Sequence, residues 1–166
     1  RWTQSQKIRS ENLLKAIYQT LERDEGGVSD AGASWRHILE RKKISQKKLW
    51  KELKSLKRSG LVTVGGGAGQ EEIFFTPEGK RHAMEIVRNH RLWELYLTHS
   101  ANFPADHVHD DAEKIEHLLG EEMVRRLEKL LNHATLDPHG RPIPSLEDLE
   151  ESRSESETSM MKSTSG

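Results

Sequence analysis

The sequence contains no cysteine among its 166 residues. This absence excludes a disulfide scaffold, a thiolate zinc site and a cysteine nucleophile. Long apolar runs are also missing, since none approaches the ~18 residues that a membrane-spanning helix needs. The start of the chain has no signal-peptide pattern. The first residue is Arg1 rather than Met, so we expect a fragment or a processed form.

Hydrophobic residues are scarce at 33%, aromatic residues make up 5%, and charged residues reach 32%. A chain of this length and composition suits one domain of ordinary size, or two small ones, with a modest core. Several catalytic signatures are absent, namely an H-E-x-x-H helix, a phosphate-binding Walker loop and a serine-centred elbow. We therefore expect no enzymatic activity.

The net charge of −1 hides two strongly charged segments. Residues 36–58 contain ten Lys or Arg and two Asp or Glu, for a net charge of +8. Residues 106–128 contain eight Asp or Glu and three Lys or Arg, for a net charge of −5. Such a separation predicts two functional surfaces.

The first half of the chain has the order of elements of a winged helix-turn-helix. A helix capped by Ser10, a helix at 34–41, a helix capped by Ser45 and two β runs at 61–64 and 73–76 are expected. Glycines between the β runs are typical of the tip of a wing. The alternative is a small α+β domain with no role on DNA, and the basic segment favours DNA because binding to phosphates needs clustered Lys and Arg.

The second half predicts helices at 77–99, 106–119 and 121–132. From residue 145 onward the chain is rich in Ser and Glu, which predicts disorder. The fold class is therefore mainly α, with a winged helix-turn-helix that carries a small β-hairpin wing, followed by an α-helical domain. The expected boundaries are 1–76, 77–144 and a disordered tail at 145–166.

Histidine and glutamate gather on helical faces in this second half. His90 and Glu94 are one helical turn apart, and His109, Glu113, Glu116 and His117 share a face of the next predicted helix. Oxygen and imidazole ligands without sulfur suit Mn²⁺, Fe²⁺, Co²⁺ or Zn²⁺. The alternative is that these residues only form the polar face of an amphipathic helix. Two such faces on adjacent helices favour a metal site.

Three segments, NHRLWELYL, HVHDDAEKIEHLL and DPHGRPIP, resemble the diphtheria toxin repressor family of metal-dependent regulators, which includes the manganese transport regulators. The resemblance covers about residues 8–144 and implies a cytoplasmic homodimer that binds double-stranded DNA. It further implies that the second half is an α-helical metal-binding and dimerisation domain. It also implies a divalent-metal cofactor, Mn²⁺ or Fe²⁺, with Zn²⁺ or Co²⁺ binding in vitro.

The resemblance also implies how the ligands are grouped. His90, Glu94 and His109 match one set of family ligands, and Glu113, Glu116 and His117 match the other set. Asn12 stands where the first helix of the family supplies an Asp or Met ligand. Lys15 stands where manganese-type members carry a Glu, and it would pair with Glu94 or Glu113 instead. We therefore expect one well-occupied metal site at most.

The recognition helix departs from a strong base-reading pattern. Lysines bind phosphates well but discriminate between bases poorly, and an exposed Trp50 on this face suggests a protein contact. The candidate DNA-binding residues are Ser45, Gln46, Lys47, Lys48 and Lys51.

Two functions remain open from the sequence. The first is a metal-dependent transcriptional regulator of metal homeostasis. The alternative is a cytosolic sensor domain fused to the C-terminus of a metal ABC transporter permease, with a membrane segment before residue 1. The missing Met, Lys15 and the weak base-reading helix favour this alternative, which would place the chain at the cytosolic face of a membrane.

Overall fold

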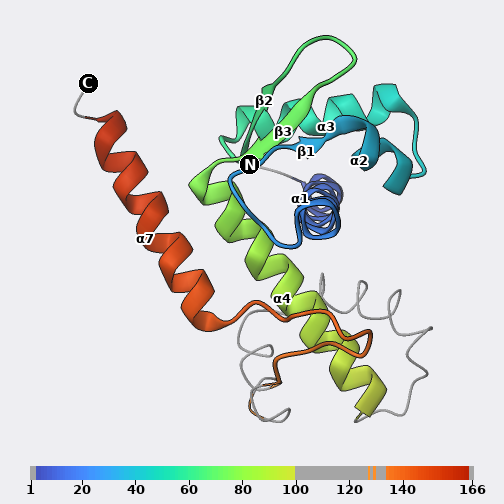
Figure 1. The fold of residues 1–166 in the computed structure, drawn as a ribbon, viewed down its shortest axis with the longest axis vertical. Coiled ribbons are helices and arrows are strands. Elements are labelled where there is room, and N and C mark those ends of the chain that lie inside the picture. The colour runs from blue at the N-terminus through green and yellow to red at the C-terminus, as the bar shows by residue number, and fades with distance from the viewer. Residues whose placement is uncertain (1–2, 100–126, 128, 130–133, 165–166) are drawn as a thin grey trace. The chain divides into compact units, whose positions relative to one another are not determined.

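The computed structural model describes residues 3–99, 127, 129 and 134–164. The chain divides into two compact units, one of residues 1–84 and 150–166 and one of residues 85–149. Helices dominate, and a small antiparallel sheet accompanies them, so the predicted mainly α fold class is confirmed (Figure 1). The domain boundaries derived from the sequence remain predictions.

Three helices form the base of the first unit: α1 (Gln4–Glu25), α2 (Trp35–Arg41) and α3 (Gln46–Arg58). They bury one apolar face each, because their apolar residues recur at helical spacing. This burial of side chains is the main favourable term in the stability of the unit. The most deeply buried side chains of these helices are Leu13, Leu14, Ile17, Leu21, Ile38, Leu49, Leu53 and Leu56.

Serines cap both α2 and α3. The cap at Ser45 is the one that the sequence predicts, whereas Ser34, expected as the first residue of a helix, caps α2 instead. The Ser34 hydroxyl accepts a hydrogen bond from the His37 amide, and the Ser45 hydroxyl accepts one from the Lys48 amide. The predicted cap at Ser10 is wrong, because α1 starts two turns earlier. Thr3 and Gln6 form a reciprocal capping box there, which satisfies two amides at the true helix start.

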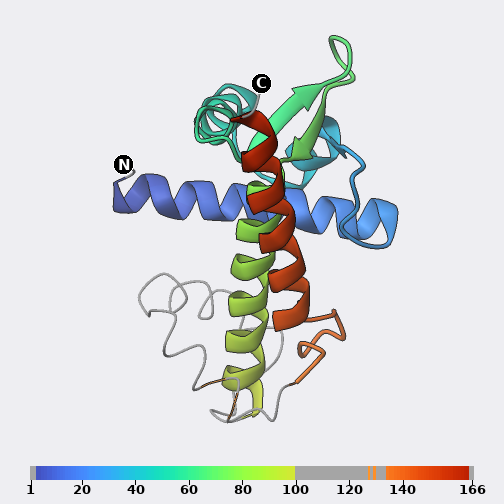
Figure 2. The same cartoon turned by 90° about the vertical axis from the view of Figure 1, so that its left-hand side faces the viewer.

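The sheet has three short strands, β1 (Ala33–Ser34), β2 (Val62–Gly65) and β3 (Glu72–Phe75), in the order β1-β3-β2. The antiparallel β2–β3 hairpin confirms the predicted wing, and its loop projects away from the helices in Figure 2. Gly66 at the base of this loop has φ +82°. A Cβ there would lie 2.3 Å from the Gln70 carbonyl oxygen, so the loop requires glycine.

Helix α4 (Pro77–His99) has the bounds that the sequence predicts. The predicted disorder of residues 145–166 is contradicted, since the structure contains helix α7 (Leu146–Ser163). Its start is capped by Ser145 and Asp148, each of which accepts a hydrogen bond from the other's amide. The small Ser152 and Ser156 are buried on one face, and Glu155 Oε2 lies 3.9 Å from Lys80 Nζ. The buried face of α7 is thus formed in part by serines, so the low apolar content of the segment does not prevent it from packing as a helix.

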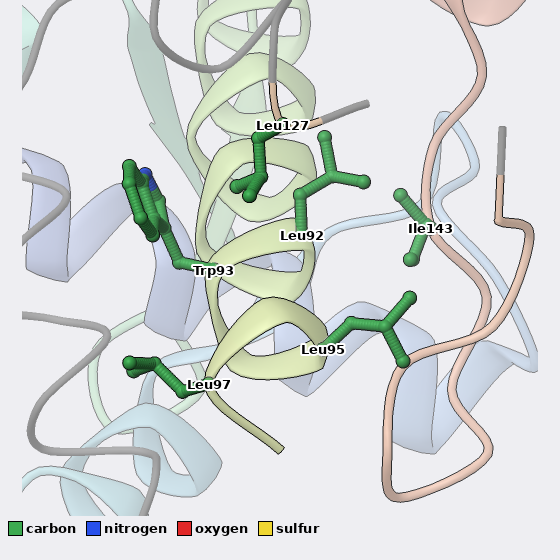
Figure 3. Packing of buried hydrophobic residues seen from close by; sticks show 6 residues of the cluster. All are labelled: Leu92, Trp93, Leu95, Leu97, Leu127 and Ile143. Carbon is green, nitrogen blue, oxygen red and sulfur yellow. The ribbon is translucent and has the colours of Figure 1, made fainter. Parts of the chain in front are cut away.

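The second unit has its own hydrophobic cluster, shown in Figure 3. Leu92 and Leu95 of α4 face Ile143, which lies in the segment before α7. Trp93 lies on another side of α4 and meets Tyr96 edge to face, with ring centroids 5.7 Å apart. The cluster therefore fixes the segment around Ile143 against the second half of α4.

The helices predicted at 106–119 and 121–132 lie almost entirely outside the described residues. Leu127 and Lys129 are described, and both are helical. None of the helices within the described part of the chain is long and apolar enough to cross a membrane.

A surface ion pair joins the end of α1 to α2, and we expect it to make the stability of the fold slightly dependent on pH in the acidic range. The Asp24 carboxylate lies 2.5 Å from His37 Nδ1, and this hydrogen bond, with a weaker one from Arg23, lowers the pKa of Asp24. A lowered carboxyl pKa stabilises the fold above the unfolded-state pKa of about 3.9. That stabilisation is lost as the pH falls through the lowered pKa.

Asp24→Asn should therefore be less stable than the wild type at pH 5, and the difference should shrink as the pH falls below about 3.9. Urea unfolding at several pH values measures this difference. Asp30→Asn, in the exposed loop, is the control and should show no such trend. A constant difference at all pH values would contradict the prediction.

Candidate metal centre

Helix α4 places His90 and Glu94 one turn apart on a face that is closed to water. Their exposed fractions are 1% and 0%, and His90 Nε2 contacts Glu94 Oε1. The structure brings this predicted pair together, as the i, i+4 spacing requires. Burial of a carboxylate is costly without partners, so Glu94 is held by several of them. Its role as a metal ligand remains a prediction.

The segment at 135–143 folds back on itself as a tight turn. An isolated bridge joins Leu136 to Pro142, and the Ile143 amide donates to the Thr135 carbonyl at 2.8 Å. Asp137 organises the turn from within. Its Oδ1 accepts the amides of His139 at 2.9 Å and Arg141 at 2.8 Å.

This turn places the side chains of Arg141 and His139 next to Glu94. Arg141 Nη2 lies 3.3 Å from Glu94 Oε2, and Arg141 Nε donates to Asp137 Oδ2 at 2.8 Å. His139 Nδ1 lies 3.2 Å from Glu94 Oε2. Two buried carboxylates and their cationic neighbours therefore share one site.

Arg91 supports the site from α4. Its Nη1 donates to the Pro142 carbonyl at 2.5 Å, and its Nε lies 3.9 Å from Asp137 Oδ2. The side chain is 1% exposed, so its charge requires the carboxylate of Asp137 nearby. The ion pair of Arg91 with Asp137 and the apolar packing of Ile143 both hold the turn against α4.

Within the part of the chain that the structure describes, one group of ligand-type residues is close enough to hold a metal ion. Ligand atoms of Glu94, Asp137 and His139 all lie within 4.8 Å of one another. Neither Asp137 nor His139 is among the ligands predicted from the sequence. They belong to the DPHGRPIP segment, which shows no helical or strand periodicity. The available signal was a charged and imidazole-containing sequence, Asp137 to Arg141, with prolines at 138 and 142.

The other predicted ligands are placed differently. His109, Glu113, Glu116 and His117 lie outside the described residues. Asn12 lies on α1, in the first unit. Its side-chain oxygen Oδ1 is buried and has no hydrogen-bond partner among the residues described. Such an oxygen is available as a ligand.

Lys15 is 6% exposed on the same helix, and it has interaction partners. Its predicted salt bridge to Glu94 or Glu113 remains a prediction.

The candidate DNA-binding residues occupy the start of α3. The structure leaves them exposed, while the leucines of the same helix are buried. Trp50 is 36% exposed, and its ring packs edge-on against Trp35 at a centroid distance of 5.7 Å. The protein contact suggested for Trp50 remains a prediction. The exposed candidates are Ser45, Gln46, Lys47, Lys48 and Lys51.

Comparisons with known proteins agree with this arrangement. A family model described as "Iron dependent repressor, metal binding and dimerisation domain" matches residues 76–145, which include His90, Glu94 and the 137–141 turn. The iron-dependent repressor IdeR of Mycobacterium leprae (strain TN) is 35% identical over 140 residues, or 84% of this chain and 57% of that protein. The diphtheria toxin repressor of Corynebacterium diphtheriae is also 35% identical, over 84% of this chain and 58% of its own length.

Solved structures give the same result. A manganese-dependent transcriptional repressor in complex with manganese matches with a TM-score of 0.70 and 30% identity, over 83% of this chain and 59% of that one. The manganese regulator SloR matches with a TM-score of 0.67 and 34% identity, over 82% of this chain and 59% of its own.

The chain thus spans less than two thirds of the length of these relatives. These relatives are regulators, and they give no support to the permease-fusion hypothesis. The chain belongs to the diphtheria toxin repressor family of metal-dependent regulators.

Proposed function

We propose that this chain is a divalent-metal-dependent transcriptional repressor that binds DNA as a homodimer in the cytoplasm. The observation that carries the proposal is the buried His90–Glu94 pair, together with the matched metal-binding and dimerisation domain around it. The relatives named above are iron-dependent or manganese-dependent repressors. Mn²⁺ and Fe²⁺ are accordingly the proposed metals.

The donor chemistry fits such an ion. Imidazole and carboxylate ligands without sulfur suit Mn²⁺ and Fe²⁺, and Asn12 adds a buried amide oxygen with no hydrogen-bond partner among the described residues. His90, Glu94 and His109 would form one ligand set. Asn12, Glu113, Glu116 and His117 would form the other.

A bound cation supplies positive charge that favours one arrangement of the ligating elements. Metal that binds more tightly to the DNA-binding arrangement increases DNA affinity by the same factor, through thermodynamic linkage. The chain's own contribution to DNA binding is the start of α3. Lys47, Lys48 and Lys51 are exposed there and carry the positive charge that phosphates require.

The test measures DNA binding by the full chain with and without metal. Fluorescence anisotropy with labelled duplex from the region upstream of its own gene should show salt-sensitive binding that depends on Mn²⁺ or Fe²⁺. Glu94→Gln keeps the shape of the side chain and removes its charge. It should raise the Mn²⁺ concentration needed for half-maximal binding by about tenfold.

The control is the second His/Glu pair on α4. Glu78 and His82 have the same i, i+4 spacing, with 3.8 Å between Glu78 Oε1 and His82 Nε2, but both are exposed. Glu78→Gln should leave the metal dependence unchanged. The proposal fails if no salt-sensitive binding occurs with either metal, or if both variants shift the metal dependence equally.

A further inference from the structure

Arg141 occupies the position beside Glu94 where a metal ion would be expected. Its guanidinium lies between two buried carboxylates, at 3.3 Å from Glu94 Oε2 and 2.8 Å from Asp137 Oδ2. Both carboxylate side chains have an exposed fraction of 0%, whereas the Arg141 side chain is 32% exposed. The guanidinium is thus a cation that enters the site from the surface.

The position of the Arg141 guanidinium follows from the charge of the two carboxylates. Two buried carboxylates need nearby positive charge, because a buried carboxylate without a counter-charge is strongly unfavourable. Arg91 and Arg141 supply that charge, since the Nε atoms of both lie within 4 Å of Asp137 Oδ2, at 3.9 Å and 2.8 Å. A divalent ion at Glu94 would place a second cation beside Arg141, where the two positive charges repel each other at short range. Glu94 therefore cannot favourably hold both cations.

The turn keeps its shape when the guanidinium leaves. Asp137 Oδ1 accepts two backbone amides, and the bridge between Leu136 and Pro142 closes the turn without any atom of the Arg141 side chain. Departure of Arg141 would leave Asp137 Oδ2 facing Glu94. The same event would leave His139 Nδ1 at 3.2 Å from Glu94 Oε2. Imidazole and two carboxylates are a suitable donor set for a divalent transition metal.

We propose that Arg141 is a built-in competitor of the metal, which a divalent ion displaces from Glu94 while it takes His139 and Asp137 Oδ2 as additional ligands. This inference rests on the proposed function, because it concerns metal binding at Glu94. It adds two ligands that the sequence pattern does not assign. Competition by an attached cation lowers the apparent metal affinity, so Arg141 sets the metal concentration at which the site fills.

The test is isothermal titration of the metal-free full chain with Mn²⁺, Fe²⁺, Co²⁺ and Zn²⁺. Arg141→Gln removes the competing charge and should increase the affinity by about tenfold, whereas Arg141→Lys retains a charge and should stay near the wild type. Arg153→Gln, at an exposed arginine of α7 that pairs with Glu157 at 3.2 Å, is the matched control and should change nothing. Arg141→Gln should also show a larger metal-induced rise in Tm than the wild type.

His139 is tested by its own substitution. His139→Ala removes an imidazole ligand but leaves the ion pair of Arg141 and Asp137 in place. It should lower the Co²⁺ affinity by about tenfold and change the visible absorption of bound Co²⁺. If Arg141→Gln fails to fold, the His139→Ala variant alone tests the proposed ligand set.

The outcomes separate the two proposals. A wild type that binds none of Mn²⁺, Fe²⁺, Co²⁺ and Zn²⁺ overturns the proposed function and this inference together. A wild type that binds metal overturns the inference alone if folded Arg141→Gln binds no more tightly, or if His139→Ala leaves both the Co²⁺ spectrum and the affinity unchanged.

Discussion

Asp137→Ala should lower the free energy of unfolding by about 3 kcal/mol, the usual loss when one partner of a buried ion pair is removed. The carboxylate accepts two backbone amides of its turn and the Nε of Arg141. It is also the nearby counter-charge of Arg91, which is 1% exposed. Alanine replaces none of these interactions. Urea unfolding followed by far-ultraviolet circular dichroism measures the loss.

Two controls separate the charge from the turn geometry. Asp137→Asn keeps a side-chain oxygen for the amides of His139 and Arg141, so it should lose less stability than the alanine variant. Asp148→Ala removes an exposed carboxylate that caps α7, and its effect should be about 1 kcal/mol or less. An Asp137→Ala loss as small as that of Asp148→Ala would contradict the role given to the buried carboxylate.

The first unit illustrates what periodicity and capping residues can predict. Ser45 caps α3 as expected, and the glycine-rich segment forms the loop of the β2–β3 hairpin. The helix predicted at 34–41 begins one residue later, at Trp35. Strand β1 was not predicted, because two residues are too short to show an alternating pattern. Its pairing with β3 depends on contacts between residues far apart in the sequence.

Helix α7 shows where composition misleads. A segment rich in Ser and Glu predicts disorder because it cannot bury a core. The low apolar content is compatible with a helix here, since serines at an i, i+4 spacing lie on the packed face. Local pairs such as Arg153 with Glu157, at 3.2 Å, add to the capping of the first turn.

The candidate site also has one part that the sequence predicts and one part that it does not. The pairing of His90 with Glu94 follows from helix geometry, which fixes the direction of side chains four residues apart. The positions of Asp137, His139 and Arg141 do not follow from spacing. In a turn, side-chain directions depend on the backbone path, and here tertiary contacts such as the bridge between Leu136 and Pro142 set that path. A site shared by a helix and a turn is therefore only half predictable.

Gly79→Ala should destabilise the first unit by about 3 kcal/mol, the upper range for overpacking of a filled space. Thr76 joins the start of α4 to the segment between α3 and β2, since its amide donates to Leu61 O at 3.1 Å and its hydroxyl donates to Gly60 O at 2.7 Å. The same hydroxyl accepts the Gly79 amide at 3.0 Å. A Cβ on Gly79 would lie 1.7 Å from Leu61 O, a backbone atom that cannot rotate away.

Helix propensity predicts the opposite sign for this substitution, because alanine is favoured over glycine inside a helix by about 1 kcal/mol. The steric contact is the larger effect, so the variant should unfold at lower urea concentration than the wild type. Gly67→Ala is the matched control, since a Cβ at this wing glycine would meet no atom within 4 Å. Its stability should stay near that of the wild type. A stabilised Gly79→Ala variant would mean that α4 does not begin in close contact with the backbone of Leu61.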